Sequence, residues 1–321
     1  MGVKVCAVVP TLNEEEYIAK CIDSLLAQTV PIDIMVLDGG STDGTLEILQ
    51  QYGTQITLLD NPGKRVSNAR NLALKNLNSD VTHCLEIIGH SWVEPDHVEK
   101  RIADLLELES KQNEKIGAIG CRTESGEPDT DVGGWIEGAL RSPIGSGGGQ
   151  FSRFNGRHRT KIPAFCLHNV EALKSVNGWD EKFITSQDSD LSMRLLNSGW
   201  NLWRSDVSCV YMNKRSTLRN WWKMCHRYGF WRTKVLLKHP KRFDIRELLP
   251  VIGLLLIFTL PQWWWAPAAY ASALLINGLV FSKKVNETLG IPICLIILHT
   301  AFTIGLFDGL IRSGKPPSDR S

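Results

Sequence analysis

The stretch that decides the fold is Val3–Thr45, which reads VKVCAVVPTLNEEEYIAKCIDSLLAQTVPIDIMVLDGGSTDGT. Two short apolar runs within it, Val3–Val9 and Ile32–Leu37, have the length and the β-branched content of buried strands. Between these runs, apolar side chains recur at helical spacing, at Tyr17, Ile18, Cys21, Ile22, Leu25 and Leu26. The pattern predicts a strand–helix–strand unit, which implies a parallel sheet with a right-handed crossover.

Each of these two predicted strands ends in a polar segment. Pro10–Glu14 follows the first strand, and Asp38–Thr45 follows the second. Because ligands of an open parallel sheet bind outside the carboxyl ends of its strands, we expect both segments to line one crevice. Shorter apolar runs predict further strands at Ile56–Leu59, Val81–Ile88, Ile116–Ile119 and Ala164–Leu167. Helical patterns between them cover Asn68–Leu77, His97–Leu108 and Val170–Val176.

The composition excludes several classes of protein. A hydrophobic content of 43% in 321 residues excludes wholesale disorder. A net charge of +2 gives no global attraction for nucleic acid, so we expect no nucleic-acid partner. The eight cysteines include no Cys-x-x-Cys pair and lie mostly in apolar runs, which predicts buried thiols in a reducing compartment. Because the chain enters a strand almost at once, we expect no signal peptide.

The C-terminal third has the pattern of a membrane-associated region. Trp221–Arg242 interleaves aromatic and aliphatic residues with basic ones, as in a helix lying in the membrane interface. Three apolar stretches follow, at Leu248–Leu260, Trp264–Phe281 and Leu289–Ile311, and only the third has full spanning length. Trp263–Trp265 stands where an interfacial belt is expected. We therefore predict attachment to the cell membrane.

Basic residues flank these apolar stretches and bear on the topology. They are dense over residues 214–246 and recur at Lys283 and Lys284, which favours a multi-pass protein with a cytoplasmic catalytic domain. If all three stretches span, however, Arg312, Lys315 and Arg320 fall on the opposite side. The number of crossings therefore stays open.

The two polar segments after the first strands, taken together, resemble those of glycosyltransferase family 2, whose members have the GT-A fold. The resemblance implies a nucleotide-diphosphate-sugar donor, with Thr11 and Glu14 near its ribose and Asp38 near its base. A carboxylate is suited to accept from a pyrimidine N–H, and glycines allow close backbone approach. The donor-binding candidates are Pro10, Thr11, Asn13, Glu14, Asp38, Ser41 and Arg65. Ser41 and its neighbours also read as a turn and a helix cap.

Arg65 belongs to the pair Lys64-Arg65, which follows the third predicted strand. Relatives in the family place an arginine here that contacts the base or the phosphates. The alternative is a solvated pair on the surface. Arg70 lies within an Ala-Arg-Asn run common in the family. Its role is open between a contact with the donor and a surface position.

The fourth predicted strand ends where family members usually carry Asp-x-Asp, the motif that holds a divalent metal on the sugar diphosphate. Here the two aspartate positions fall on Ile88 and His90. A neutral imidazole suits Mn²⁺, and the diphosphate supplies further oxygens, so the resemblance implies a divalent metal (Mn or Mg) held by His90. Loss of the aspartate weakens such a site or makes it depend on Glu86 or Asp96. A hydrogen-bonded loop histidine is the alternative.

Asp188 is the candidate catalytic base. Residues 178–188 resemble the family's Gly-x-Asp-Glu-x-Phe segment and the acidic pair that follows it, with Gln187 in place of the usual glutamate. The chemistry requires one carboxylate that removes the proton of the acceptor hydroxyl. The alternative role for Asp188 is a helix N-cap. Asp190 is expected to pair with Arg194 four residues on.

Two further segments narrow the branch of the family. Ser142–Gly149 and His226–Gly229 look like the succinoglycan-type exopolysaccharide glycosyltransferases, which also carry C-terminal membrane segments. The Gln-x-x-Arg-Trp motif of processive relatives is absent, which argues against a processive synthase.

We therefore expect an α/β protein with a GT-A, Rossmann-like nucleotide-sugar-binding domain of mostly parallel sheet, followed by interfacial and transmembrane helices. The expected boundaries are 1–215 for the catalytic domain, 216–246 for the interfacial region, 247–312 for the membrane region and 313–321 for a polar tail.

The expected activity is inverting transfer of a sugar to a membrane-linked polyprenyl-diphosphate saccharide. Two alternatives stay open: direct transfer to polyprenyl phosphate, and a degenerate, non-catalytic protein that binds nucleotide sugar or lipid, for which Ile88 and Gln187 argue.

Overall fold

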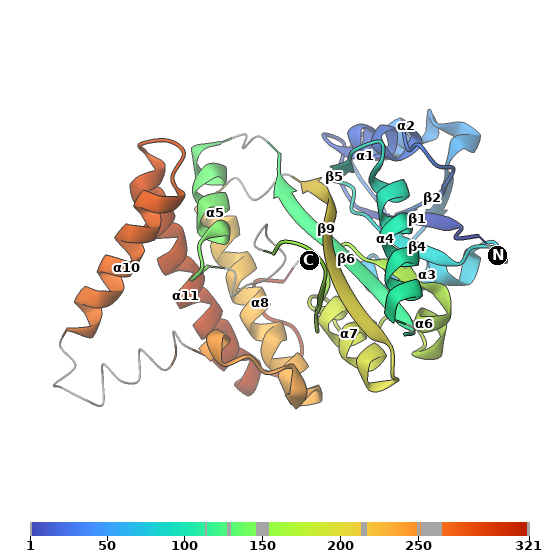
Figure 1. The fold of residues 1–321 in the computed structure, drawn as a ribbon. Helices are drawn as coiled ribbons and strands as arrows, with labels where there is room; N and C mark the ends of the chain where they lie inside the picture. Colours follow the sequence, from blue (N-terminus) through green and yellow to red (C-terminus); the bar gives the residue numbers. More distant parts are fainter. Residues whose placement is uncertain are drawn as a thin grey trace. The chain divides into compact units, whose positions relative to one another are not determined.

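The computed structural model describes residues 2–112, 114–126, 130–145, 154–212, 217–248, 251 and 265–319. They form two compact units, each built from two separate segments of the chain (Figure 1). The first unit comprises Met1–Glu124 and Phe154–Met212, and the second comprises Ser125–Arg153 and Asn213–Ser321. The second segment of the first unit ends three residues before the boundary expected at residue 215.

The first unit is built on one mixed sheet. Its strands are β1 (Val5–Thr11), β2 (Asp33–Asp38), β3 (Thr57–Asp60), β4 (His83–Glu86), β5 (Ser91–Val93), β6 (Ile116–Ser125), β7 (His158–Arg159), β8 (Leu167–Asn169) and β9 (Asn201–Met212). The order is β3-β2-β1-β4-β8-β6-β9-β5, and β7 pairs with β9. Strands β3, β2, β1 and β4 are parallel, whereas β8 pairs antiparallel with β4 and β6, and β9 pairs antiparallel with β5 and β7.

Helices cover both faces of this sheet, because the parallel strands are apolar on both sides. The helices are α1 (Ile18–Leu26), α2 (Thr45–Gln50), α3 (Val66–Asn76), α4 (His97–Gln112), α6 (Val170–Ser175) and α7 (Gln187–Asn197). Helices α1, α2 and α4 share one core cluster with Val5, Ala7 and Val9 of β1. Helices α3, α6 and α7 share the other with Cys6 and Val8 of the same strand. The alternation of β1 thus places one hydrophobic core on each face.

The α/β architecture predicted from residues 3–45 is confirmed, but the expectation of a mostly parallel sheet was wrong. The sheet is mixed, because β5, β7, β8 and β9 pair antiparallel with their neighbours. Strands β5 and β9 were not predicted, since β9 carries polar residues and β5 is only three residues long. The strand expected over Val81–Ile88 is limited to His83–Glu86, and the chain then turns over Ile88–Ser91. Of the eight cysteines, seven are buried and all are free thiols, as expected.

The second unit is helical. It contains α5 (Asp131–Arg141), α8 (Leu218–Lys238), α10 (Ala266–Phe281) and α11 (Glu287–Ile311), with short 3₁₀ turns at Pro240–Arg242 and Ile245–Leu248. These four helices share one core that includes Ile136, Trp221, Leu274 and Ile291. Residues 122–160 are rich in glycine, and their sequence pattern predicts a long irregular loop, but helix α5 forms within them. Its hydrophobic face is completed only by residues about 150 positions later in the chain.

The aromatic residues of α8 differ from the expectation of a helix lying in the membrane interface. Trp221 and Phe230 are completely buried within the second unit. The indole N–H of Trp221 donates to the carbonyl of Cys294 on α11 at 2.9 Å. Helix α8 therefore uses these two rings to pack against α11.

The membrane segments are described in part. The first apolar stretch, Leu248–Leu260, lies almost wholly outside the described residues, as do Trp263 and Trp264. Among the described residues, α11 is the one helix long and apolar enough to cross a membrane, and half of its most apolar window is buried in this unit. Helix α10, with 16 residues, is shorter. The described residues thus support one candidate span, and the multi-pass arrangement is not supported.

Candidate active site

The polar segments after β1 and β2 are joined to each other by hydrogen bonds. The backbone N–H of Asn13 donates to Oγ of Ser41 at 2.9 Å, and the Asn13 side-chain oxygen accepts from the N–H of Thr42 at 2.8 Å. The N–H of Glu14 donates to Oγ1 of Thr45 at 2.9 Å. Asn13 has a φ of 54°, in the left-handed region that asparagine tolerates better than most residues. The crevice predicted at the carboxyl ends of these two strands is therefore assembled, and Asn13 and Ser41 help to build it.

Both carboxylate oxygens of Asp38 accept hydrogen bonds from the loop that follows it. Its Oδ2 accepts from the N–H groups of Gly40 and Ser41 at 2.8 and 2.9 Å, and its Oδ1 accepts from the Ser41 hydroxyl at 2.5 Å. The residue is only 3% exposed. Gly40 has a φ of 87°, which favours glycine at this position. The contact with a nucleobase predicted for Asp38 stays a prediction, and the structure adds that this carboxylate holds the loop closed.

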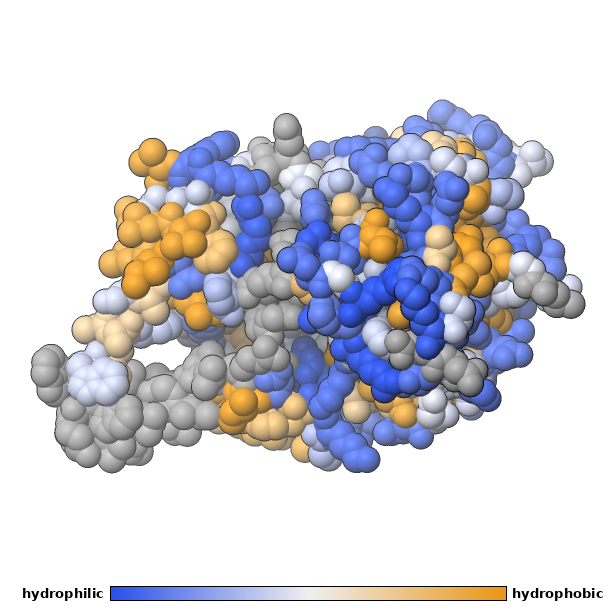
Figure 2. Space-filling view, in the orientation of Figure 1, coloured by the Kyte–Doolittle hydropathy of each residue, from blue (hydrophilic) through white to orange (hydrophobic). Residues whose placement is uncertain are grey.

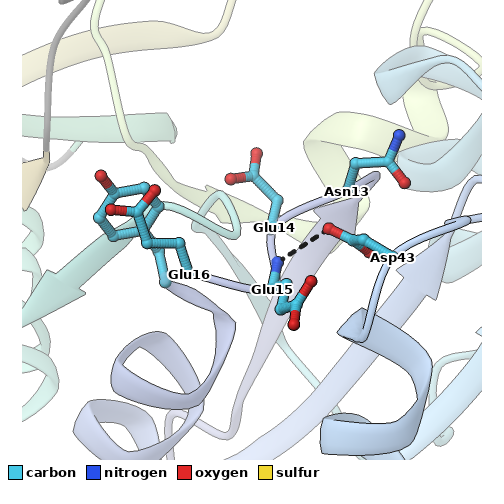
Figure 3. A pocket seen from close by; sticks show the side chains of 6 residues that line it. Asn13, Glu14, Glu15, Glu16 and Asp43 are labelled. Carbon is cyan, nitrogen blue, oxygen red and sulfur yellow. Dashed lines mark hydrogen bonds between the residues drawn. The ribbon is translucent and has the colours of Figure 1, made fainter.

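A shallow pocket lies beside the first polar segment (Figure 3). Its lining residues are Asn13, Glu14, Glu15, Glu16, Tyr17 and Asp43. In Figure 3 the carboxylates of Glu15 and Asp43 lie close together, and the dashed line marks the bond from the N–H of Glu15 to Asp43, 3.2 Å long. Because its lining is acidic, this pocket repels a bare diphosphate. The donor phosphates therefore require positive charge from elsewhere.

Positive charge lies at the carboxyl end of β3, at Lys64 and Arg65. Both residues are exposed, and Lys64 has a φ of 58°. Nη1 of Arg65 donates to the carbonyl of Glu181 at 3.1 Å. Asn61 ties this segment back to β2, since its N–H donates to the carbonyl of Asp38 at 2.7 Å. Arg65 is thus placed between the Asp38 loop and the segment that leads to Asp188.

Helix α3 fixes the segment that precedes Asp188. The side chain of Asn71 donates to the carbonyl of Trp179 and accepts from its N–H, both at 2.8 Å. The Nδ2 atoms of Asn71 and Asn68 also donate to the two carboxylate oxygens of Glu181. Gly178, with a φ of 66°, packs against Asn71 so closely that a β-carbon would lie 2.4 Å from its Oδ1. The resemblance of residues 178–188 to the family segment therefore corresponds to a turn held by α3.

Asp188 lies in the first turn of α7, two residues after Ser186, whose φ is 62°. Its Oδ1 accepts from Nη1 of Arg70 on α3. The Asp188 side chain is 43% exposed, whereas that of Arg70 is 6% exposed. Among the described residues, Oδ2 of Asp188 has no assigned partner. A carboxylate with one oxygen fixed and part of its surface open has the geometry of a general base.

Behind this ion pair lie two further buried side chains, Glu86 and His168. Nη1 of Arg70 is 3.2 Å from Oε1 of Glu86 at the end of β4. Nε2 of His168 on β8 is 3.1 Å from the same oxygen. Burial opposes ionisation of Glu86, but Arg70 and His168 together lower its pKa to about 2. Burial raises the pKa of Asp188, with Arg70 opposing and Glu86 adding to the rise.

His90 has a carboxylate partner of its own. Its Nδ1 lies 2.7 Å from Oε1 of Glu14, which leaves Nε2 free to bind a metal ion. A carboxylate on the other ring nitrogen is the usual companion of a histidine ligand, so the donor set fits a divalent metal held by His90. Ile88 contributes no ligand atom and is half-buried in the turn after β4. Glu14, predicted beside the ribose, is thus placed against His90.

Glu86 and Asp96, the two acids that could replace the missing aspartate as metal ligands, both already have charged partners. Glu86 ends its strand among buried groups and is contacted by Arg70. Asp96 forms an ion pair with Lys100 at 2.7 Å. Glu86, Cys166 and His168 lie close enough together to hold an ion, but the guanidinium of Arg70 already neutralises that carboxylate. Of the residues named for the metal, His90 keeps a ring nitrogen available, and its role as a metal ligand stays a prediction.

Sequence reasoning missed the group behind Asp188. Arg70 was singled out without a role, and Glu86 was considered only as a metal ligand. His168 was not considered. A charged residue at the end of a strand otherwise made of buried residues was the one available signal, since buried charges require partners. The partners come from α3, β8 and α7, and no local pattern connects them.

Two known proteins are similar to this chain over nearly its whole length. The succinoglycan biosynthesis protein ExoA of Rhizobium meliloti is 26% identical over 339 residues, covering 95% of this chain and 94% of the relative. A Methanococcus voltae protein is 26% identical over 322 residues, covering 96% and 97%; its name is dolichyl N-acetyl-alpha-D-glucosaminyl phosphate 3-beta-D-2,3-diacetamido-2,3-dideoxy-beta-D-glucuronosyltransferase.

Solved structures share the fold. The mannosyltransferase PcManGT of Pyrobaculum calidifontis, in complex with GDP-Man and Mn²⁺, matches with a TM-score of 0.58 at 15% identity, covering 97% of this chain and 88% of that one. TarS 1–349 of S. aureus matches with a TM-score of 0.52 at 14% identity, covering 95% and 91%.

The sheet has the GT-A fold of these solved glycosyltransferase structures. Residues 6–137 match the family described as glycosyl transferase family 2. The chain therefore carries a glycosyltransferase family 2 domain and is a transferase.

Proposed function

We propose that this enzyme transfers a sugar, with inversion, from a nucleotide-diphosphate sugar to a saccharide carried on a membrane polyprenyl diphosphate. The observation that carries the proposal is the geometry of Asp188. One of its oxygens is fixed by the buried Arg70, while 43% of the side chain remains exposed at the start of α7. This is the arrangement that a single displacement requires of its base.

In that displacement, Asp188 removes the proton of an acceptor hydroxyl while the hydroxyl oxygen attacks the anomeric carbon of the donor. The bond from that carbon to the diphosphate oxygen breaks, and the nucleoside diphosphate leaves with the electron pair. The raised pKa of Asp188 strengthens it as a proton acceptor relative to an ordinary aspartate. Inversion follows because attack and departure occur on opposite faces of the sugar.

The donor is placed by the loops after β1, β2 and β3. We assign the nucleoside to the segment around Thr11, Asn13 and Asp38, and the diphosphate to the positive side chains of Lys64 and Arg65. A divalent metal, when bound, neutralises charge that develops on the leaving diphosphate. His90 is the residue that holds it, and Glu14 orients the imidazole through Nδ1.

The acceptor assignment is supported by one relative of nearly full length. The name of the Methanococcus voltae protein describes a transferase that acts on a dolichyl-phosphate-linked N-acetylglucosamine. Such an acceptor presents a sugar hydroxyl, which needs a base. Direct transfer to polyprenyl phosphate would use an oxygen that is already anionic. That reaction needs no general base, and Asp188 would have no proton to remove.

Attachment to the membrane is part of the same proposal. Exposed apolar side chains gather on α10, at Leu275, Ile276, Leu279 and Val280, and Figure 2 shows an apolar surface in this region. A bilayer covers such a surface and raises the effective concentration of a lipid-linked acceptor. We place the catalytic unit on the cytoplasmic side, in keeping with eight free thiols.

The proposal is tested with detergent-purified protein, a panel of UDP- and GDP-sugars and a lipid extract as acceptor source, with Mn²⁺, Mg²⁺ or EDTA. We expect Asp188→Asn to lower kcat by about 10²- to 10⁴-fold while nucleotide binding is retained. Asp190→Asn is the matched control, because Asp190 pairs with Arg194 at 2.8 Å. Its transfer rate should fall only in proportion to any loss of folded protein.

Two results would contradict the proposal. Full transfer by Asp188→Asn would favour the anionic polyprenyl phosphate acceptor. Donor binding without turnover under every metal condition and with every acceptor would favour a binding protein.

A further inference from the structure

A group of buried charges lies directly behind Asp188 and takes no direct part in the transfer step. Nη1 of Arg70 contacts Asp188 and also lies 3.2 Å from Oε1 of Glu86, which in turn lies 3.1 Å from Nε2 of His168. The four groups come from α7, α3, β4 and β8. The side chains of Arg70, Glu86 and His168 are almost fully buried, and only that of Asp188 opens to solvent.

Placing these charges in the interior is costly, and packing alone does not require them. Desolvation of a buried ion pair commonly offsets its Coulomb attraction, and apolar residues of the same size are often equally stable. The Nε atom of Arg70 is buried without a hydrogen-bond partner in the described chain. A cost of this kind indicates that the charges serve the site.

The surroundings hold Arg70 in one place. Trp179 lies over its guanidinium at 5.5 Å and meets the ring of His168 edge-on at 5.7 Å. The second oxygen of Glu86 accepts from the N–H of Cys166 at 3.2 Å, which anchors Glu86 to the backbone before β8. Arg70 is thus fixed from behind by Glu86 and on one side by Trp179.

We propose that Arg70 is the positioning residue of the catalytic base Asp188. Glu86 and His168 in turn hold the Arg70 side chain in place. Arg70 fixes Oδ1 of Asp188, so that the other oxygen faces the acceptor hydroxyl. This inference rests on the proposed role of Asp188 as the base.

Glu86 has a second task in this arrangement, which is to balance the charge of Arg70. A lone arginine beside an aspartate lowers its pKa and weakens it as a base. The groups that face Asp188 are Arg70 from α3, Glu86 from β4, and His168 and Cys166 from β8 and its approach. Burial and Glu86 together outweigh Arg70, and the pKa of Asp188 is raised. Arg70 therefore orients Asp188, and the pKa of Asp188 still stays above its ordinary value.

The test uses two variants with opposite expected effects. Arg70→Gln removes the charge that lowers the pKa of Asp188, whereas Glu86→Gln removes a charge that raises it. Protein labelled with carboxyl-¹³C aspartate is titrated by NMR, and the Asp188 resonance is assigned by its absence from Asp188→Asn. We expect the midpoint to rise by about one pH unit in Arg70→Gln and to fall by a similar amount in Glu86→Gln.

The acid limb of kcat/KM against pH should move in the same two directions. Arg70→Lys keeps the charge but lacks the planar guanidinium, whose Nη1 contacts both acids. Its kcat should fall by about 10- to 100-fold with the donor KM and the acid limb nearly unchanged. Asp104→Asn is the control for loss of a buried charge, because Asp104 belongs to a separate ion pair with Arg157.

The outcomes separate this inference from the proposed function. Titrations of Asp188 that move in the same direction in both charge variants, or no more than in Asp104→Asn, overturn the positioning role even if Asp188→Asn is inactive. Transfer retained by Asp188→Asn overturns the base and this inference with it. The NMR titration needs no turnover, so it reports on Arg70 and Glu86 even in variants without activity.

Discussion

At the scale of single residues, two positions depart from the family pattern, Gln187 beside the candidate base and Ile88 at the expected metal site. Gln187 is buried, and its Oε1 has no partner among the described residues. Ile88 removes a metal ligand, while His90 keeps a carboxylate on its other nitrogen. The proposed metal site therefore has less negative charge than the family pattern, while its histidine is still oriented by Glu14. Such a site depends on the oxygens of the donor diphosphate to complete its coordination.

The metal site is tested by restoring the missing carboxylate. We expect Ile88→Asp to tighten Mn²⁺ binding in the presence of a nucleoside diphosphate by about tenfold, because an added anionic oxygen strengthens a divalent cation site. Binding is measured by the electron paramagnetic resonance signal of free Mn²⁺. Ile88→Asn is the matched control of equal size without charge, and His90→Gln should weaken binding. Equal affinities of the aspartate and asparagine variants would contradict this assignment.

At the scale of elements, α8 and α11 approach each other unusually closely. A β-carbon on Gly305 would lie 2.1 Å from the carbonyl oxygen of His226, and one on Gly229 would lie 2.1 Å from that of Phe302. The hydroxyl of Thr233 donates to the carbonyl of Leu306 at 2.8 Å. Close backbone approach through small residues is the mode of helix packing used where lipid removes the hydrophobic driving force. The second unit thus depends on glycines at this crossing.

Gly305→Ala should therefore destabilise the second unit. The added methyl group meets backbone atoms, which cannot move aside as a flexible side chain does, so we expect a loss of about 1–3 kcal/mol. Thermal unfolding in detergent measures the effect. Leu310→Ala on the same helix is the control, because Leu310 is exposed and its truncation should change stability by less than about 0.5 kcal/mol. Equal unfolding temperatures for the two variants would contradict the close crossing.

At the scale of the whole molecule, the two units differ in what they expose. The first unit buries its apolar residues on both sides of the sheet. The second buries one helical core and leaves a series of large apolar side chains exposed on α10 and α11. An uncovered apolar surface of this kind in a soluble protein is an aggregation liability, whereas a bilayer covers it at no cost.

The exposed side chains of α10 provide a test of membrane attachment. We expect simultaneous replacement of Leu275, Ile276 and Leu279 by serine to release protein from the membrane pellet during alkaline extraction. Each side chain loses about 1.5–3 kcal/mol of apolar transfer free energy if lipid covers it. Leu106→Ser is the control, since Leu106 is exposed on α4 of the first unit and should not affect extraction. Release of the wild type and the triple variant to the same extent would contradict the prediction.

The sequence by itself determined the parts of this protein whose signals are local. The strand–helix–strand pattern of residues 3–45 specified the parallel pair β1 and β2, because period and β-branched content report burial directly. The polar segments after its strands marked the candidate site because ligands of such a sheet bind at its strand ends, and the segment around Asp188 marked it through its resemblance to the family. Helix α11 was recognisable from its length and apolarity alone.

Only the tertiary structure decided the antiparallel half of the sheet, the helix α5 and the environment of Asp188. Strand β9 and helix α5 are stabilised by partners far along the chain, so their own residues carry weak patterns. Arg70, Glu86 and His168 lie 118, 102 and 20 positions before Asp188 in the sequence, yet they form one connected group with it. The orientation and basicity of the catalytic carboxylate depend on distances in a desolvated interior, and no one-dimensional pattern encodes those distances.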